Sequence, residues 1–475
     1  MGWGNKSVNA QRIGLFGGLG VFIAMLLMPV PEAMSAEAWK VAALTILMAT
    51  WWMTQAVPLT ATALLPFLAL PLFDVMTTRE AASQYYSPIL FLILGGAFLA
   101  LAIERVGLHK RLALAIIGMA GKSAWGILLA FMIATAILSM LISNTSSTLI
   151  MIPIAVAVLV AGGIRDGETD GFAGALVMGV AFAASIGGVG TLVGSPTNAI
   201  AAGLMNKTLD MEIDFLTWLK FGMPIVIIGI PVLAGLLIAV QKVGRNSFDG
   251  SKVQSAIGSP GPWSIPEKRV VPVVALVVLG WLFLPQLKAI APEGALHDGT
   301  IAIIGGLLLF MLPDGTGRKL LNWDEADRAP WGVIMMFGGG LALAAGIIDS
   351  GLADWLGGAL EPLKAVPVIV IAVALVALVI LVTEFASNVA TASGVMPVVA
   401  SLILATGVDP VLLAMPAAVA ASWGFMLPSG TGPNAIAWST NHIELPKMLK
   451  TGFLLDLAGI PIVIGCIWLV AFLSS

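Results

Sequence analysis

The chain has 475 residues, of which 59% are hydrophobic and only 10% are charged, and its mean hydropathy is +1.01. Soluble domains carry roughly 25% charged residues, so this composition is typical of a polytopic membrane protein. The formal net charge of -3 offers no basic face for nucleic acid, and the single cysteine, Cys466, excludes an intrachain disulfide framework and a cysteine-based zinc cluster.

The first predicted element is an apolar run over residues 13–30, preceded by Lys6 and Arg12. A signal peptide ending near the small residues 33–36 is an alternative. The run is long for a cleaved segment and further apolar runs follow, so we interpret it as an uncleaved first span. Further spans are predicted at residues 41–57, 59–73 and 88–103. Each is near the length that a tilted or slightly short helix needs to cross a bilayer core of roughly 30 Å.

Residues 107–120 combine a basic triplet, His109 to Arg111, with leucine and isoleucine, which predicts a helix lying in the membrane interface. The other two histidines also fall in loops or at segment ends. Their positions share no metal-ligand spacing and therefore predict no histidine metal site.

A short polar stretch, Ser143-Asn144-Thr145, then interrupts an apolar region that has no charge between Lys122 and Arg165. Non-helical backbone at membrane depth is tolerated only inside protein or beside a water-filled cavity. The stretch therefore predicts the tip of a re-entrant hairpin over 123–162. Two ordinary spans joined by a short polar loop would give the same pattern, and the sequence does not separate the two.

The following segment, 171–206, is apolar until it reaches four glycines and a proline within 187–200. This pattern predicts a broken helix whose free backbone groups face a ligand. A span over 222–240 then leads to the longest polar stretch, which we interpret as a cytoplasmic linker over 242–269.

The second half repeats this order of segments. Spans are predicted at 270–283, 300–312 and 331–348, followed by an interfacial piece around Asp354 and Trp355, a hairpin over 365–406, a broken helix over 409–441 and a last span over 453–472. The second hairpin carries Ser387-Asn388-Val389 at its tip. In both tips a proline, Pro153 or Pro397, follows the third residue after eight positions, and both breaks contain Asn-Ala-Ile.

These landmarks indicate an internal duplication into residues 1–241 and 270–475. Interruptions in corresponding positions of two halves are typical of substrate and ion sites in transporters. With the N-terminus inside, seventeen Lys and Arg residues fall in inner segments and six in outer ones. This bias predicts about eleven transmembrane helices plus two hairpins that enter from opposite faces, an inverted repeat, with the C-terminus outside.

The tip residues suit both a cation and an anion. Hydroxyl and amide oxygens are hard, neutral ligands for an ion such as sodium, while amide nitrogens and free N–H groups at a helix start attract a carboxylate. A single Ser-Asn-Thr could simply bridge helices, but the duplication favours a site. An enzyme is not predicted, because no lysine follows the glycines and no His or Cys accompanies Ser143 or Ser195. A membrane enzyme or a structural subunit is the alternative.

The paired tips, Thr383-Glu384-Phe385 before the second, and the two breaks together resemble the divalent anion/sodium symporter (DASS) family, which includes the INDY and NaDC-type dicarboxylate carriers. The likeness covers nearly the whole chain in segment order. It implies an all-α polytopic membrane protein of the elevator type, in which a hairpin-bearing transport domain moves against a scaffold, and a homodimer in the cell membrane.

The resemblance also implies the site residues. One sodium site would be formed by Ser139, Ser143, Asn144 and the backbone of Gly194, and the other by Thr383, Ser387, Asn388 and the backbone of Gly430. The anion would lie against Asn144, Thr145, Ser195, Asn388, Val389 and Thr431. Because Val389 lacks the hydroxyl of Thr145, the two ends of the anion pocket would be unequal.

The implied function is sodium-coupled symport of a small divalent anion, which we expect to be a C4-dicarboxylate such as succinate, with no organic cofactor and no catalytic residue. Sulfate or a tricarboxylate as substrate, dicarboxylate exchange, and proton coupling remain alternatives. Glu384 is the one charge between Lys364 and Asp409. An intramembrane acid is a functional candidate by default, but its counterpart in the first half is Met140. Family members with Glu at this position suggest a packing or hydrogen-bonding role.

Overall fold

The computed structural model describes residues 3–165, 167–243 and 261–474. Within these ranges every regular element is a helix, and the only strand-like feature is an isolated bridge between Pro313 and Lys319. The predicted all-α architecture is therefore confirmed. Most of the predicted linker, residues 244–260, lies outside the described residues.

The first half begins with helices that correspond to the predicted spans and the interfacial segment: α1 (Trp3–Leu27), α2 (Ala36–Thr54), α3 (Leu59–Thr62), α4 (Leu65–Leu72), α6 (Pro88–Val106) and α7 (Leu108–Gly118). A short helix that was not predicted, α5 (Thr78–Ser83), precedes α6. The first hairpin is α8 (Ala124–Ser139) and α9 (Asn144–Ala161), and it is followed by α10 (Phe172–Val189), α11 (Pro196–Thr208) and α12 (Phe215–Gln241). The predicted span at 59–73 is divided between α3 and α4.

The second half follows the same plan. It comprises α14 (Ile265–Leu282), α15 (Leu284–Lys288), α16 (Asp298–Met311), α17 (Trp323–Ala326), α18 (Trp331–Asp349), α19 (Leu352–Leu360) and the 3-10 helix η2 (Glu361–Ala365). The second hairpin is α20 (Val368–Phe385) and α21 (Asn388–Thr406), and α22 (Pro410–Ala420), α23 (Gly432–Trp438) and α24 (Leu445–Ser474) complete the chain.

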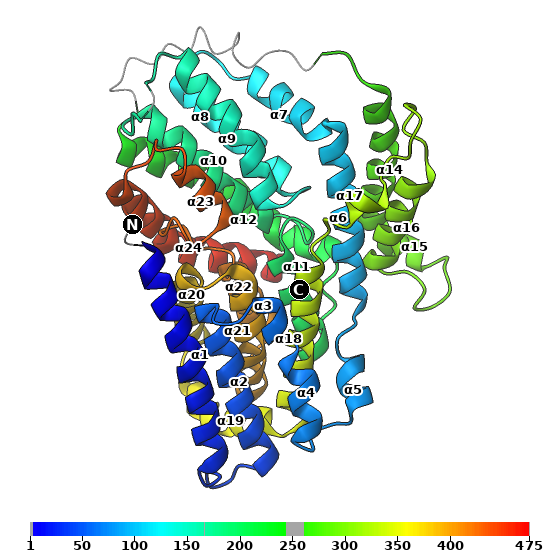
Figure 1. Ribbon diagram of the computed structural model, residues 1–475, viewed down its shortest axis with the longest axis vertical. Helices are drawn as coiled ribbons and strands as arrows, with labels where there is room; N and C mark the ends of the chain where they lie inside the picture. Colours follow the sequence, from blue (N-terminus) through cyan, green and yellow to red (C-terminus); the bar gives the residue numbers. More distant parts are fainter. Residues whose placement is uncertain (1–2, 166, 244–260, 475) are drawn as a thin grey trace.

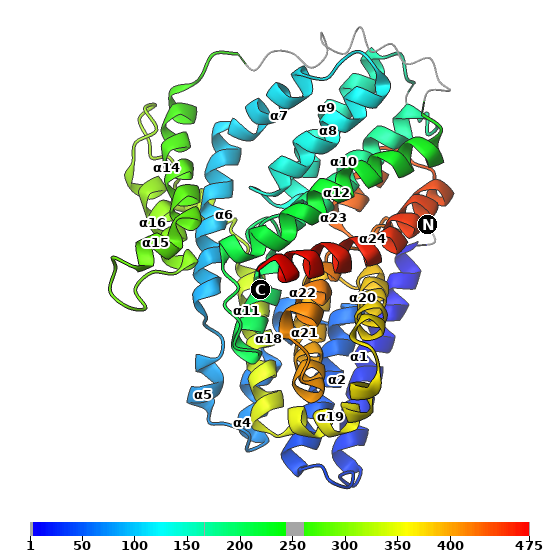
Figure 2. The same cartoon turned by 180° about the vertical axis from the view of Figure 1, so that it is seen from behind.

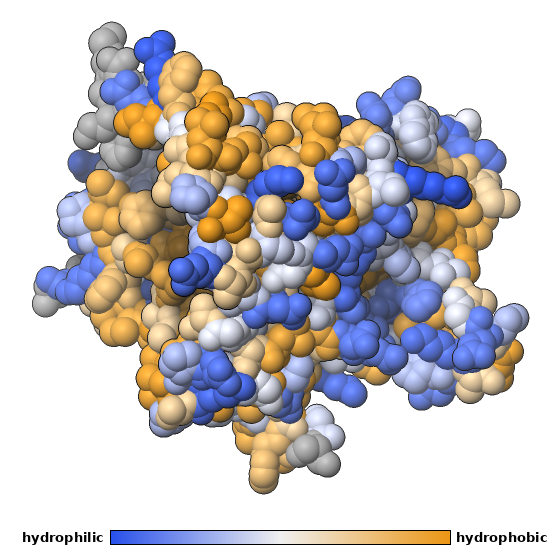
Figure 3. Space-filling model, turned by 90° about the horizontal axis from the view of Figure 1, so that it is seen from below, coloured by the Kyte–Doolittle hydropathy of each residue, from blue (hydrophilic) through white to orange (hydrophobic). Residues whose placement is uncertain are grey.

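Among the described residues, nine helices are long and apolar enough to cross a membrane, and four shorter apolar helices accompany them. Large apolar side chains such as Phe16, Leu381 and Leu473 are exposed on the surface of the protein. An extensive apolar surface is expected where a protein contacts lipid. Seen from below, hydrophilic residues gather over the middle of that end of the molecule, and hydrophobic residues surround much of it (Figure 3).

The two hairpins start from opposite ends of the molecule (Figure 1). Helix α6 leads to α7 at one end, from which the α8–α9 hairpin returns toward the middle. Helix α18 runs to α19 at the other end, from which the α20–α21 hairpin returns toward the middle. The interfacial helix predicted at 107–120 is α7, and the piece around Asp354 is α19. This is the arrangement expected of an inverted repeat.

Helix α10 lies at the centre of the fold, and all of its residues are buried. It packs against α8, α9 and α12, and α12 runs beside α24 (Figure 2). Small residues allow this close packing: a Cβ at Gly187 would lie 2.4 Å from the Cα of Ala136 in α8. Helices in membranes commonly approach one another at such small residues, and here they bring the first break into the interior.

Candidate functional site

Each hairpin tip is a helix start. Ser143 is the N-cap of α9, and its Oγ accepts the N–H of Ser146 at 3.1 Å. Ser387 caps α21 in the same way, with Oγ accepting the N–H of Ala390 at 3.2 Å. The second and third tip residues therefore lie in the first turn of the returning helix. Backbone N–H groups without an intrahelical partner occur at such a start, which suits it to an anion.

The two predicted breaks are also present. Helix α10 ends at Val189 and α11 begins at Pro196, after the N-cap Ser195. Helix α22 ends at Ala420 and α23 begins at Gly432, after the N-cap Thr431, whose Oγ1 accepts the N–H of Asn434 at 3.2 Å. The second break is longer than the first, and each break ends in a further helix start.

A first cluster of polar groups joins the first hairpin to the first break. The buried Ser139 Oγ lies 2.7 Å from the carbonyl oxygen of Ala184 and 2.6 Å from the amide of Asn144. With its nitrogen facing Ser139, the Asn144 amide donates to Ser139 Oγ at 2.6 Å, to Ala184 O at 3.2 Å and to Gly194 O at 3.3 Å. Three of the four residues predicted for the first sodium site thus meet. The fourth, Ser143, caps the helix beside them.

Glycine is required in this cluster because backbone and side chains approach too closely for a Cβ. A Cβ at Gly188 would lie 2.1 Å from Asn144 Oδ1, and one at Gly194 would lie 2.6 Å from Gly188 O. The glycine-rich composition of the first break therefore has a steric cause, and any larger residue at these two positions would displace the Asn144 amide or the neighbouring carbonyl.

The second cluster repeats the pattern of the first. The buried Thr383 Oγ1 lies 2.7 Å from the carbonyl oxygen of Ala421 and 2.9 Å from Asn388 Oδ1. Thr383 and Asn388 therefore meet as Ser139 and Asn144 do. The nearest atoms around a Cβ at Gly430 would be Leu427 O at 3.3 Å and Glu384 O at 3.5 Å.

Two asparagines that sequence reasoning did not select hold the breaks in place. Asn198 Nδ2 donates to the carbonyl oxygens of Gly188 at 2.7 Å and Thr191 at 2.8 Å, and Asn434 Nδ2 donates to Leu427 O at 3.0 Å. Both side chains are fully buried, and the Oδ1 atom of each has no hydrogen-bond partner among the residues that the structure describes. The sequence did contain a signal for these two residues, because they are the asparagines of the Asn-Ala-Ile triplet that both breaks share.

Glu384 supports the second break with its carboxylate. Oε1 accepts the N–H of Met426 at 2.8 Å, and Oε2 accepts the N–H of Leu427 at 3.1 Å. Because Glu384 satisfies two N–H groups that the interrupted helix leaves free, its observed role is the hydrogen-bonding one suggested by the sequence.

The two halves interleave at the tips. Thr145 of the first tip packs on Gly432 at the start of α23, where a Cβ would lie 2.6 Å from Thr145 Oγ1. Helix α21 of the second hairpin packs against α11 of the first half. Each hairpin therefore contacts the broken helix of the opposite half. Val389, predicted to touch the anion, is half-buried. It packs against the large apolar core that contains α10 and against a smaller apolar cluster that includes residues of α2 and α18.

A cavity of about 210 Å³ opens beside the first tip. Beside the tip its lining includes Ser143, Ser146, Gly194 and Ser195, while α6 supplies mostly apolar residues, and the charged residues Glu104 and Arg328 also line it. The volume is below the roughly 300–1,000 Å³ of sites for drug-sized ligands, so the cavity fits a small solute. Of the residues predicted to bind the anion it includes Ser195, while the others lie outside its lining: Asn144, Thr145, Asn388, Val389 and Thr431.

The chain is similar to known transporters in sequence and in fold. Residues 10–474 match the model of the sodium:sulfate symporter transmembrane region. The chain is 40% identical to a sodium-dependent dicarboxylate transporter, SdcS, of Staphylococcus saprophyticus, over 97% of this chain and 91% of that protein. It is also 40% identical to SdcS of Staphylococcus aureus, with the same shares covered. The YdaH transporter of Alcanivorax borkumensis has a similar fold, with a TM-score of 0.56 and 16% identity over 92% of this chain and 98% of that one.

Proposed function

The chain belongs to the sodium:sulfate symporter family, also called the divalent anion/sodium symporter family, and from this premise we propose that it couples sodium to the uptake of a C4-dicarboxylate such as succinate. The relatives at 40% identity are named sodium-dependent dicarboxylate transporters, and the chain is a transporter rather than an enzyme. The single observation that carries the proposal is the pair of equivalent oxygen clusters, each formed between a hairpin tip and a helix break.

We assign the two clusters to sodium. In the first, the Ser139 hydroxyl and the carbonyl oxygens of Ala184 and Gly194 converge on the Asn144 amide. Rotation of that amide would add its oxygen to the set, giving neutral hard ligands of the kind that sodium binds. In the second, Thr383, Asn388 and the carbonyl of Ala421 form the corresponding set. We propose that Ser143, Ser387 and Gly430 complete the two sites.

We place the anion between the tips. The helix starts at Asn144 and Asn388 leave backbone N–H groups without an intrahelical partner, and Ser195 and Thr431 cap the helices that follow the breaks. Four helix starts would then surround one dianion, each favouring negative charge. Sodium bound beside the same tips would orient these groups, which would couple the two ligands.

Uptake into proteoliposomes tests this proposal directly. Purified protein should accumulate labelled succinate when an inward sodium gradient is imposed, and an equal potassium gradient should not drive uptake. Inhibition of succinate uptake by sulfate or citrate would show whether these anions also bind. Uptake that requires dicarboxylate inside the vesicles would indicate exchange. Accumulation driven by a pH gradient without sodium would overturn sodium coupling.

We further propose that the protein is a homodimer in the cytoplasmic membrane, with the N-terminus inside, the C-terminus outside, and a hairpin-bearing transport domain that moves as an elevator. The Lys and Arg bias supports this orientation. In a Cys466→Ser background, a cysteine introduced at the exposed residue Glu293 should label from outside, and one at the exposed residue Asp324 should label from the cytoplasmic side. Labelling of both from one side would refute the orientation.

A further inference from the structure

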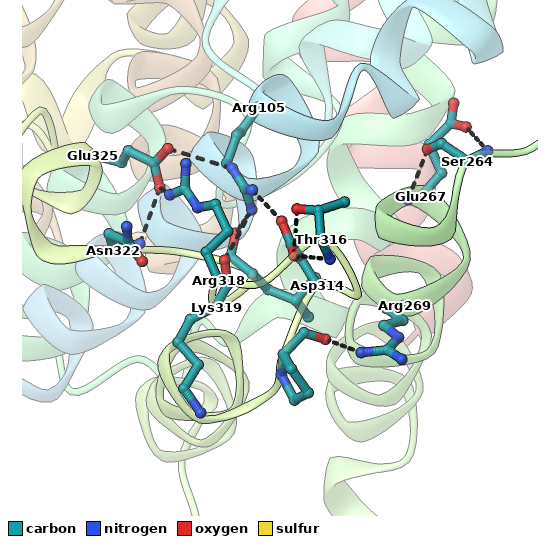
Figure 4. Close-up of polar contacts among 12 residues, drawn as sticks. Arg105, Ser264, Glu267, Arg269, Asp314, Thr316, Arg318, Lys319, Asn322 and Glu325 are labelled. Carbon is teal, nitrogen blue, oxygen red and sulfur yellow. Dashed lines mark hydrogen bonds and ion pairs between the residues drawn. The ribbon is translucent and has the colours of Figure 1, made fainter.

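Basic residues cluster where α6 ends and the loop before α17 folds back on it (Figure 4). Arg105 pairs with Asp314 and donates to Leu320 O at 2.6 Å, and Glu325 lies 3.4 Å from Arg105 Nε and 2.6 Å from Arg318. Although burial raises the pKa of the Asp314 carboxyl, hydrogen bonds from Thr316 and Arg105 outweigh it and hold that pKa well below its usual range. The charges of Arg105 and Arg318 are thus largely neutralised by local carboxylates.

Arg328 differs from these neighbours. Its Nε donates to the backbone oxygen of Glu325 at 3.4 Å, its side chain is exposed, and it forms no ion pair with any residue that the structure describes. It nevertheless lines the cavity whose lining includes Ser143 and Ser195. A guanidinium that forms no ion pair with a described residue therefore lies in the lining of the cavity that reaches the first tip.

We propose that Arg328 is an anion-docking residue, which attracts the dicarboxylate into this cavity and delivers it to the tip residues. The inference rests on the proposed function and adds a residue to it. A guanidinium binds carboxylates through planar paired N–H groups, and a dianion is attracted twice as strongly as a monoanion. A cavity with apolar walls strengthens this attraction by focusing the field of the charge.

Glu104 lines the same cavity from α6 and carries the opposite charge. It should repel the dianion, so neutralising Glu104 should change KM in the direction opposite to neutralising Arg328. Lys319 supplies a matched control: it lies in the same connection between α16 and α18, on the other side of α17, and it has the same charge as Arg328. Its Nζ donates to Met311 O at 2.7 Å, but it does not line the cavity. Loss of net charge alone would affect Lys319→Gln and Arg328→Gln equally.

The experiment measures succinate entry from the cavity side, which is the cytoplasmic side in the proposed orientation, with inside-out membrane vesicles at saturating sodium. Arg328→Gln should raise KM by about three- to tenfold at low ionic strength without changing the maximal rate, because one charge acts at short range on a dianion. Arg328→Lys should restore most of the affinity. Glu104→Gln should lower KM, and Lys319→Gln should behave as the parent does.

High ionic strength, adjusted with choline chloride at constant sodium, should bring all the variants to the KM of the parent. Equal effects of Arg328→Gln and Lys319→Gln, or a rise in KM that salt does not remove, would overturn the docking role. A parent protein that takes up no succinate would refute the proposed function itself. If Arg328→Gln does not fold, the sign of the Glu104→Gln effect and the salt dependence of the parent's KM decide the question.

Discussion

The two oxygen clusters are alike in plan and differ in how the break beside each is supported. In the first half, the Thr191 hydroxyl donates to Met140 O at 2.7 Å, and Asn198 donates to two carbonyls of the break. In the second half, the Glu384 carboxylate accepts two N–H groups of a longer break. Interrupting a helix frees donors and acceptors alike. In the first half, neutral side chains donate hydrogen bonds to the free carbonyl oxygens. In the second half, a charged carboxylate accepts hydrogen bonds from the free N–H groups.

The difference explains why the acid occurs in only one repeat. Met140 stands at the position of Glu384, but only its backbone oxygen takes part in the first cluster. The first cluster is also more tightly enclosed, since a Cβ at Gly188 would meet Asn144 at 2.1 Å, whereas one at the corresponding Gly424 would meet Thr383 Cγ2 at 3.0 Å. The first site therefore depends on steric fit and the second on a hydrogen-bonded charge.

The largest expected effect tests the steric fit. Gly188→Ala should reduce sodium-driven uptake by about 100-fold, because overpacking a closely packed site costs roughly 1–3 kcal/mol and here the added methyl overlaps a proposed ligand. Gly424→Ala should reduce it only a few-fold. Uptake with purified, monodisperse protein provides the measurement. Equal loss in the two variants would contradict the proposed difference between the halves.

Replacing the charge of the second half should mainly reduce stability. Glu384→Gln should lower the free energy of unfolding by about 1.5–3 kcal/mol, the value of hydrogen bonds to a charged group, since a Gln amide offers only one acceptor oxygen for two N–H groups. Thermal unfolding in detergent measures this loss, and Met140→Leu should show little change. If uptake by Glu384→Gln loses a pH dependence that the parent has while its stability is unchanged, Glu384 carries a coupled proton instead.

The hydroxyl groups of the two clusters should contribute to sodium affinity. Thr383→Val keeps the shape of the side chain and removes its oxygen, so it should raise the sodium concentration for half-maximal uptake by about three- to tenfold, while near-saturating sodium restores most of the dicarboxylate affinity. Ser139→Ala should have a smaller effect, because the Asn144 amide also reaches Ala184 O and Gly194 O. Unchanged sodium dependence in Thr383→Val would remove this residue from the cation site.

The smallest effect concerns the third residue of each tip. Val389→Thr would make the second tip resemble the first, and the added hydroxyl should change the ranking of competing dianions by about threefold and at most about tenfold, since one hydrogen bond contributes roughly 0.5–1.5 kcal/mol. Thr145→Val should change the ranking in the opposite direction. Competition profiles that superimpose on that of the parent would show that Val389 does not contact the anion.

The order of the segments was determined by the sequence alone. Apolar runs, the glycine-rich breaks and the two polar tips depend on composition and on neighbouring residues, so they could be recognised without the fold. The pairing of Ser139 with Asn144, and of Thr383 with Asn388, was expected from the resemblance, and the structure brings each pair into contact. The tips were predicted as polar interruptions between apolar arms, and in the structure Asn144 and Asn388 begin the returning helices.

Only the tertiary structure decided which distant groups meet. The N–H partners of Glu384 lie 42 and 43 residues further along the chain, Thr145 packs on Gly432 of the other half, and Arg328 borders a cavity formed by the first tip and α6. Local sequence specifies that a broken helix leaves polar groups free, but many residues could satisfy them. Which residues do so follows from how the inverted halves pack around the buried helix α10, a property of the whole chain.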